Sequence, residues 1–269
     1  MIHLSPMVLA FQLIGLFHRR MVDECRQRAC IWCGETNELS KEHVVPAWLG
    51  RELQQQQHPG VRIAARYRLG NNVEARIWED KDPFSMRVKK FCEECNNGWM
   101  SRLEDTAKGH LLPLINGADY TLSTAAQSIV AAWFFKTACV YDVVGPGDYV
   151  PSIHRETFFR THQPPSGVVV HLAPRVVDHE LPPVIQQRLR EARFEDGGIE
   201  AYKAVIAIGH VIAQVIGFPG FESAEGTEDM AAGAIRIWPV VAEIAWPGEL
   251  HRLTVDDTLA YTTVEIDIG

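Results

Sequence analysis

The stretch KEHVVPAWL, residues 41–49, lies between two Cys-x-x-Cys pairs that are separated by 58 intervening residues. The four cysteines are Cys30, Cys33, Cys92 and Cys95. Each pair can form a tight turn that presents two thiolates, and two such turns complete the tetrahedral coordination of one structural zinc ion. We therefore expect a zinc-stabilised fold. Because sulfur already satisfies the zinc, Glu42 and His43 are metal-capable side chains left for other chemistry.

The composition is that of a soluble globular protein. The chain has 269 residues, of which 46% are hydrophobic and 22% charged, enough for one large or two modest domains. No apolar run reaches the roughly 18 to 20 residues that a transmembrane helix needs. The apolar stretch at 7–17 is followed rather than preceded by basic residues, unlike a signal peptide. We therefore expect no membrane association and a cytoplasmic location, where paired cysteines bind metal more often than they form disulfides.

The charge is unevenly distributed along the chain. Residues 1–116 hold 16 Lys and Arg against 14 Asp and Glu, residues 117–269 hold 10 against 20, and the whole chain has a net charge of −8. The first part contains two basic clusters, which suit phosphate groups or, equally, a solvated strand face. Their members are Arg62, Arg66, Arg68, Arg87, Lys89 and Lys90. We expect the acidic second part to bind a ligand or a protein partner.

Three segments are predicted: an N-terminal helical segment at 1–27, a zinc-stabilised domain at 28–116 and an α+β domain at 117–269. Within the zinc domain we expect a helix opened by Pro46, a strand leading into the second cysteine pair, and a helix that follows it. The helix after the second pair has an apolar face at four-residue spacing, which predicts packing against the rest of the domain. That face includes Trp99, Leu103 and Leu111.

The second part opens with a predicted core helix at 124–144, in which Thr124 and Gln127 fit a capping box. Its wide apolar surface predicts that Trp133 and Phe134 are buried. Val- and Ile-rich segments predict strands, two of which form a hairpin that turns near Gly209. The strands are expected at 166–177, 200–209, 210–218 and 234–244, with a short helix at 181–195.

With these residues the chain resembles the HNH endonuclease superfamily, whose active site is a ββα-metal finger. The resemblance rests on CIWC at 30–33, KEHVVP at 41–46 and CEECNNGW at 92–99, and it covers residues 28 to about 110. The chain is also similar to bacterial HNH-like proteins that carry a C-terminal extension. The resemblance implies an α+β chain, with a zinc-stabilised HNH finger at 28–116 followed by an α+β C-terminal domain.

The resemblance implies a role for each residue of the motif. His43 matches the general base that deprotonates the water attacking a phosphodiester. Glu42 and Asn96 match the two protein ligands of a single catalytic divalent ion, Mg²⁺ or Mn²⁺, which neutralises charge in the transition state. The four cysteines match the ligands of a separate structural Zn²⁺. A neutral imidazole near pH 7 is suited to accept the proton of the water.

Two features depart from the family pattern. The middle Asn of the signature has no obvious equivalent, and Asn71, Asn72 and Asn97 stay open as alternatives. Glu42 stands where Asp is commoner, which lengthens the ligand by one methylene group and keeps its chemistry.

We therefore expect a metal-dependent HNH endonuclease that acts on DNA, with RNA as the alternative substrate. Residues 117–269 would supply specificity, regulation or partner binding, and a bacterial defence role suits such a nuclease. The alternative hypothesis is a catalytically inactive, zinc-stabilised module that binds nucleic acid or protein. The sequence leaves the oligomeric state open, a homo-oligomer included.

Overall fold

The computed structural model of the chain describes residues 29–36, 38–55, 63–69, 72–78, 86–144, 149–177, 188–193, 199–220, 233–254 and 257. The predicted N-terminal helical segment, residues 1–27, lies outside these described residues. The described chain is a mixture of helices and strands, so the predicted α+β class is confirmed.

The cysteine-containing part is built around a short antiparallel ladder. Strand β1 (Leu39–His43) pairs with β4 (Arg87–Cys92), with Leu39 opposite Cys92 and His43 opposite Arg87. Helix α2 (Ala47–Gln55) follows β1, and β2 (Ile63–Leu69) forms a hairpin with β3 (Asn72–Trp78). A π-helical turn, η2 (Cys95–Met100), continues directly into α3 (Ser101–Ile115).

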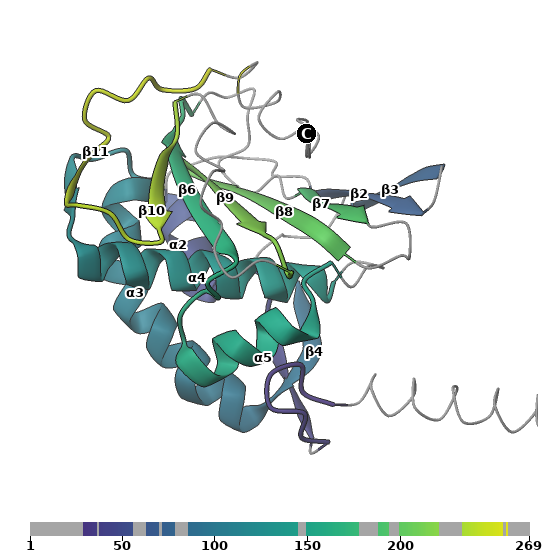
Figure 1. Cartoon of the computed structure of the whole chain (residues 1–269). Helices are drawn as coiled ribbons and strands as arrows, with labels where there is room; N and C mark the ends of the chain where they lie inside the picture. Colours follow the sequence, from purple (N-terminus) through teal and green to yellow (C-terminus); the bar gives the residue numbers. More distant parts are fainter. Residues whose placement is uncertain are drawn as a thin grey trace, which may run out of the picture.

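The second part is an antiparallel sheet with helices on one side (Figure 1). The strand order is β10-β6-β9-β8-β7. The strands are β6 (Val168–Pro174), β7 (Arg188–Arg193), β8 (Ile199–Ile208), β9 (Val211–Gly217) and β10 (Ile235–Trp238). Helices α3, α4 (Thr124–Asp142) and α5 (Ser152–Thr161) lie on the same side of this sheet (Figure 1). A further two-stranded ladder joins β5 (Tyr120–Leu122) to β11 (Ile244–Trp246).

The hairpin between β8 and β9 turns at the predicted place. Gly209 has φ of +50°, a left-handed conformation that disfavours residues with a Cβ. A Cβ at this position would also lie 2.3 Å from the carbonyl oxygen of Ile115, at the end of α3. The neighbouring His210 N–H donates to that same oxygen over 2.9 Å, so the hairpin turn also closes the C-terminus of α3.

One apolar core runs through both predicted domains. Trp32, from the first cysteine turn, lies 5.2 Å from Trp99 and 5.6 Å from Phe158 of α5, measured between ring centroids. Trp48 of α2 similarly lies 6.5 Å from Trp133 of α4. The buried cluster that contains these rings extends across the predicted boundary at residues 116 and 117, because α4 and α5 pack against the cysteine-containing part.

The predicted core residues are mostly where the sequence indicates. Trp133 and Phe134 are fully buried, and so is Leu111. Trp99 is 7% exposed, whereas Leu103 is only partly buried. Among the described residues, no helix is long and apolar enough to cross a membrane.

The predicted capping box is wrong by one residue. Ser123, not Thr124, is the N-cap of α4, and its Oγ accepts a hydrogen bond from the Ala126 N–H over 3.2 Å. Gln127 is fully buried, and its amide bonds to backbone groups of the loop at 241–242 instead of capping the helix. A buried amide must find partners wherever they lie, so tertiary packing overrides the local motif.

Two predicted elements of the second part also differ. Residues 188–193 of the predicted helix form strand β7, although Arg, Leu, Glu and Ala all favour helices, because pairing with β8 overrides this local preference. The strand predicted at 234–244 contains β10 and only the first residue of β11, and these two strands pair with different partners. Pro239 separates them, since proline cannot donate to a ladder.

The shared core predicts cooperative unfolding. Phe158 is fully buried, and its ring centroid lies 4.9 Å from that of Phe135. Its ring also packs against Trp32 and Trp99. Phe158→Ala should lower the free energy of unfolding by about 3–5 kcal/mol, the usual cost of emptying an aromatic core position. Urea titrations followed by tryptophan fluorescence and by circular dichroism should give one coincident transition. Two separate transitions, with only one shifted by the substitution, would contradict a common core.

A buried histidine on the outer face of the sheet should make the protein less stable in acid. His171 of β6 is 5% exposed. Its burial, and to a smaller extent the positive charges of Arg236 and Lys203, lower its pKa to about 4. Below the usual pKa of about 6.5, the unfolded chain binds a proton here that the folded chain excludes. The free energy of unfolding should therefore fall between pH 6.5 and pH 4, by up to about 1.4 kcal/mol per pH unit for this one group.

The matched variant for this effect is His171→Gln, which cannot take up that proton. Urea unfolding with excess zinc, at intervals from pH 7 to pH 5, should give a shallower pH dependence in the variant than in the natural chain. Identical slopes would mean that His171 is not held neutral in the fold.

Candidate functional site

The first cysteine pair sits in a tight turn before β1. The Cys30 N–H donates to the carbonyl of Glu35 over 2.8 Å, and the Gly34 N–H donates to the carbonyl of Cys30 over 2.9 Å. Gly34 has φ of +75°, a conformation that a glycine adopts without strain. The Ile31 N–H donates to the carbonyl of Lys90, which ties the turn to β4.

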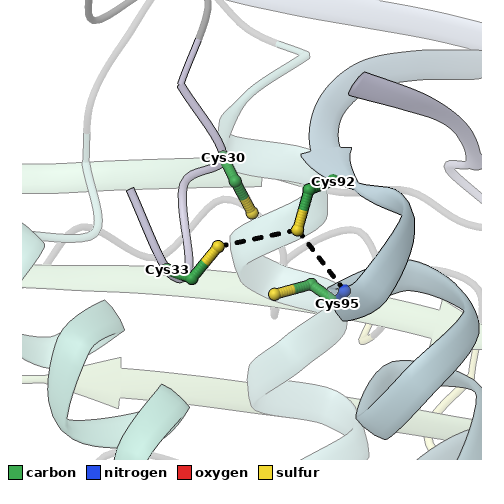
Figure 2. Close-up of side chains that lie close together, drawn as sticks. All are labelled: Cys30, Cys33, Cys92 and Cys95. Carbon is green, nitrogen blue, oxygen red and sulfur yellow. Dashed lines mark hydrogen bonds between the residues drawn. The ribbon is translucent and has the colours of Figure 1, made fainter. Parts of the chain in front are cut away.

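The second pair comes from the end of β4 and the start of η2. The four Sγ atoms of Cys30, Cys33, Cys92 and Cys95 lie within 4.8 Å of one another (Figure 2). Those of Cys33 and Cys92 are 3.5 Å apart. Thiolates at about 2.3 Å from a tetrahedral zinc would be separated by about 3.8 Å, so the four side chains fit this ion. The predicted meeting of the two cysteine pairs is thus confirmed.

The protonation of these thiols agrees with a metal site. Burial raises the pKa of the Cys33 thiol to about 11 and raises that of Cys95 as well. Burial also opposes ionisation of Cys30, but hydrogen bonds from backbone groups lower its pKa overall. No disulfide links the cysteines of the described part of the chain. A bound cation would supply the charge that these thiols need in order to ionise together.

Glu42 lies beneath the ladder, facing the core. It is 9% exposed, and its Oε1 lies 3.9 Å from the Nζ of Lys136. Burial raises the pKa of the Glu42 carboxyl to about 7. The positive charge of Lys136 and a hydrogen bond from the Asn96 side chain lower this pKa, but they do not cancel the effect of burial. Nearby Glu104 raises this pKa further, since it bears the same charge.

Asn96 is the first residue after the second cysteine pair, and it is fastened to β1. Its Nδ2 donates to Ser40 Oγ over 2.9 Å, and that hydroxyl donates to the carbonyl of Phe91 over 3.0 Å. Because Ser40 lies two residues before Glu42 on β1, this hydrogen bond places the Asn96 side chain near Glu42, whose pKa it lowers. Both carry oxygen atoms of the kind that Mg²⁺ and Mn²⁺ prefer.

His43 lies on the other face of β1, as strand alternation requires. Its Nε2 accepts a hydrogen bond from Arg87 Nε over 3.1 Å, which requires an unprotonated Nε2. The pKa of His43 is lowered, mainly by burial and then by the positive charge of Arg87. The negative charge of Glu104 acts in the opposite direction. Arg87 and Lys89 are exposed on this face, because alternate residues of β4 point the same way. Among the described residues, no hydrogen bond joins His43 to Asn96.

The structure adds two charged residues that sequence reasoning missed. Lys136 of α4 comes from the second half of the chain, and its ammonium lies near both Glu42 of β1 and Glu104 of α3. The signal for Lys136 was present in the sequence, since it is a single lysine inside an apolar helix whose other positions predict burial. The signal for Glu104 was absent, because an acidic residue in the first turn of a helix is ordinary.

The middle position of the family signature stays open. Asn97 is exposed, and its side chain donates to Glu93 of the same helical segment over 3.4 Å. Asn72 begins β3, and Asn71 lies outside the described residues. Of the other predicted basic residues, Arg66 and Arg68 belong to β2 and Arg62 lies outside the described residues.

No family model, no curated protein and no solved structure matches this chain.

The cysteine cluster predicts a structural metal. Cys92→Ser should lose the bound zinc and lower the free energy of unfolding by several kcal/mol, because binding of a structural zinc is coupled to folding. Elemental analysis should find one zinc per natural chain and much less than one in the variant. Cys139→Ser is the matched control, since Cys139 is fully buried in α4 outside the cluster. Natural protein that folds without zinc would contradict this assignment.

Proposed function

We propose that this chain is a zinc-stabilised, metal-dependent nuclease of the HNH type that hydrolyses phosphodiester bonds, with DNA as its substrate. The observation that carries the proposal is the hydrogen bond from Asn96 to Ser40, which places the residue after the last cysteine against the strand that carries Glu42, beside the four-cysteine cluster. A structural zinc site has no need for either Glu42 or Asn96. The pair supplies hard oxygen donors at the two positions where the family resemblance requires them.

His43 acts in this proposal as the general base. Its Nε2 carries a lone pair in the resting state, because it accepts from Arg87. When Arg87 turns to a phosphate oxygen of the substrate, this nitrogen is free to take the proton of the attacking water. The lowered pKa of His43 keeps the ring neutral near pH 7, which is the form that a base requires.

The remaining groups bind and orient. Glu42 and Asn96 would hold a divalent cation, Mg²⁺ or Mn²⁺, that stabilises the negative charge of the transition state when bound. Arg87 and Lys89 are exposed beside His43 and suit the phosphate backbone of a nucleic acid. The acidic second part is proposed to supply specificity, regulation or a binding surface for a ligand or protein.

A second candidate function is a zinc-stabilised binding module without hydrolytic activity. The observation that favours it is the burial of Glu42 next to the ammonium of Lys136, because a structural carboxylate has such a partner. The two functions differ in what they require of His43, which a binding module could lose without effect on its chemistry.

The experiment that tests the proposal is a cleavage assay on plasmid, linear and single-stranded DNA and on RNA, with Mg²⁺ or Mn²⁺. His43→Ala should lower the cleavage rate by on the order of 10² to 10⁴, the usual contribution of a positioned base. Zinc content and thermal stability should stay close to those of the natural chain, since His43 is only half-buried.

Asn96→Ala should act differently from His43→Ala. Loss of a ligand should weaken activation by the divalent ion, and raised Mn²⁺ should partly restore cleavage. His110→Ala is a control, because His110 bonds to Tyr120 away from the site. If His43→Ala cleaves as fast as the natural chain, or if no nucleic acid is cleaved, the binding module replaces the nuclease.

A further inference from the structure

Lys136 is an unusual residue for its position. It lies in the middle of α4, where every residue from 130 to 140 is buried, and it is itself only 2% exposed. Burial of an ammonium group costs several kcal/mol unless close partners compensate for its lost hydration. The Lys136 side chain points toward α3 and β1, and an apolar side chain would avoid this cost, so the lysine calls for another explanation.

The partners of Lys136 come from two other elements. Its Nζ lies 2.5 Å from Glu104 Oε1 of α3 and 3.9 Å from Glu42 Oε1 of β1. The ammonium therefore joins α4 of the second part to the strand that carries the proposed metal ligand. Replacing buried ion pairs by apolar side chains of similar volume is often neutral or stabilising, so stability alone does not account for this arrangement.

We propose that Lys136 is a positioning residue of the nuclease site, whose ammonium, held by Glu104, orients the Glu42 carboxylate toward the cation that it shares with Asn96. This inference rests on the proposed function and extends it, because it makes α4 part of the site. The finger alone would then lack a component of its own metal centre.

The distances from the Lys136 ammonium to Glu104 and to Glu42 indicate how strongly it interacts with each carboxylate. Glu104 is in direct contact with the ammonium and neutralises most of its charge, whereas Glu42 is more than 1 Å farther away. Glu42 lies beyond hydrogen-bond distance of the ammonium, so the attraction between the two is purely electrostatic and leaves the carboxylate oxygens available to a divalent ion. Partners that orient a metal ligand typically raise metal affinity by 10- to 100-fold.

The test measures Mn²⁺ affinity of the zinc-loaded, full-length chain by electron paramagnetic resonance, in which free and bound Mn²⁺ have distinct signals. The main variant is Lys136→Met with Glu104→Gln, which removes the ammonium together with its contacting carboxylate at nearly constant volume and leaves Glu42 without its cationic neighbour. We expect its dissociation constant for Mn²⁺ to rise by about 10- to 100-fold, with zinc content unchanged.

A second variant keeps the test informative if the double variant does not fold. Glu104→Gln alone leaves the ammonium with Glu42 as its one carboxylate partner, so the chain retains a buried ion pair. The ammonium then competes with the cation for Glu42, and Mn²⁺ binding should weaken by about tenfold. Lys108→Met is the matched control, because Lys108 is exposed on the next turn of α3 and lies over the Trp48 ring; it should bind Mn²⁺ as the natural chain does.

The outcomes separate this inference from the proposed function. Folded variants that bind Mn²⁺ as tightly as the natural chain, or more tightly, overturn the positioning role and leave the nuclease proposal standing. A natural chain that binds no Mn²⁺ beside its zinc overturns both. Weaker binding in the two site variants, with the Lys108→Met control unchanged and normal thermal unfolding, supports the assignment of Lys136.

Discussion

The geometry of the candidate site depends on the meeting of four thiols, three of them buried, from two turns that lie far apart in the sequence. The first turn is tied to β4 through a backbone hydrogen bond from Ile31, and the second begins where β4 ends. Burial disfavours ionisation of the Cys33 and Cys95 thiols, so the cluster needs a cation before it can act as a clamp. With the two turns joined, β1 pairs with β4, and the Asn96 side chain donates a hydrogen bond to Ser40.

Aromatic side chains pack around the four-cysteine cluster. Trp32 and Trp99 flank the cysteine turns, and both contact Phe158 of α5. Helix α4 brings Trp133 against Trp48 in the same way. The cysteine-containing part is too small to bury these rings by itself, so the second part of the chain completes its core as well as carrying its own sheet.

The two faces of the β1–β4 ladder differ in charge. The inner face holds Glu42 and Glu104 around the ammonium of Lys136, and burial raises the pKa of the Glu42 carboxyl to about 7. The outer face presents Arg87 and Lys89 beside His43. The proposed metal ligand Glu42 and the proposed base His43 therefore project from different faces of the ladder, although Glu104 shifts the pKa of both.

The sequence by itself determined the α+β class, the cysteine cluster, the helix after the second cysteine pair and the burial of Trp133, because each follows from a local spacing or periodicity. The turn at Gly209 was equally readable, since a single glycine breaks two Val- and Ile-rich runs. Only the tertiary structure decided that Gln127 serves a distant loop, that residues 188–193 complete a sheet edge, and that Lys136 and Glu104 reach Glu42. Those results depend on which surfaces meet, and partners from separate elements leave no periodic trace in the chain.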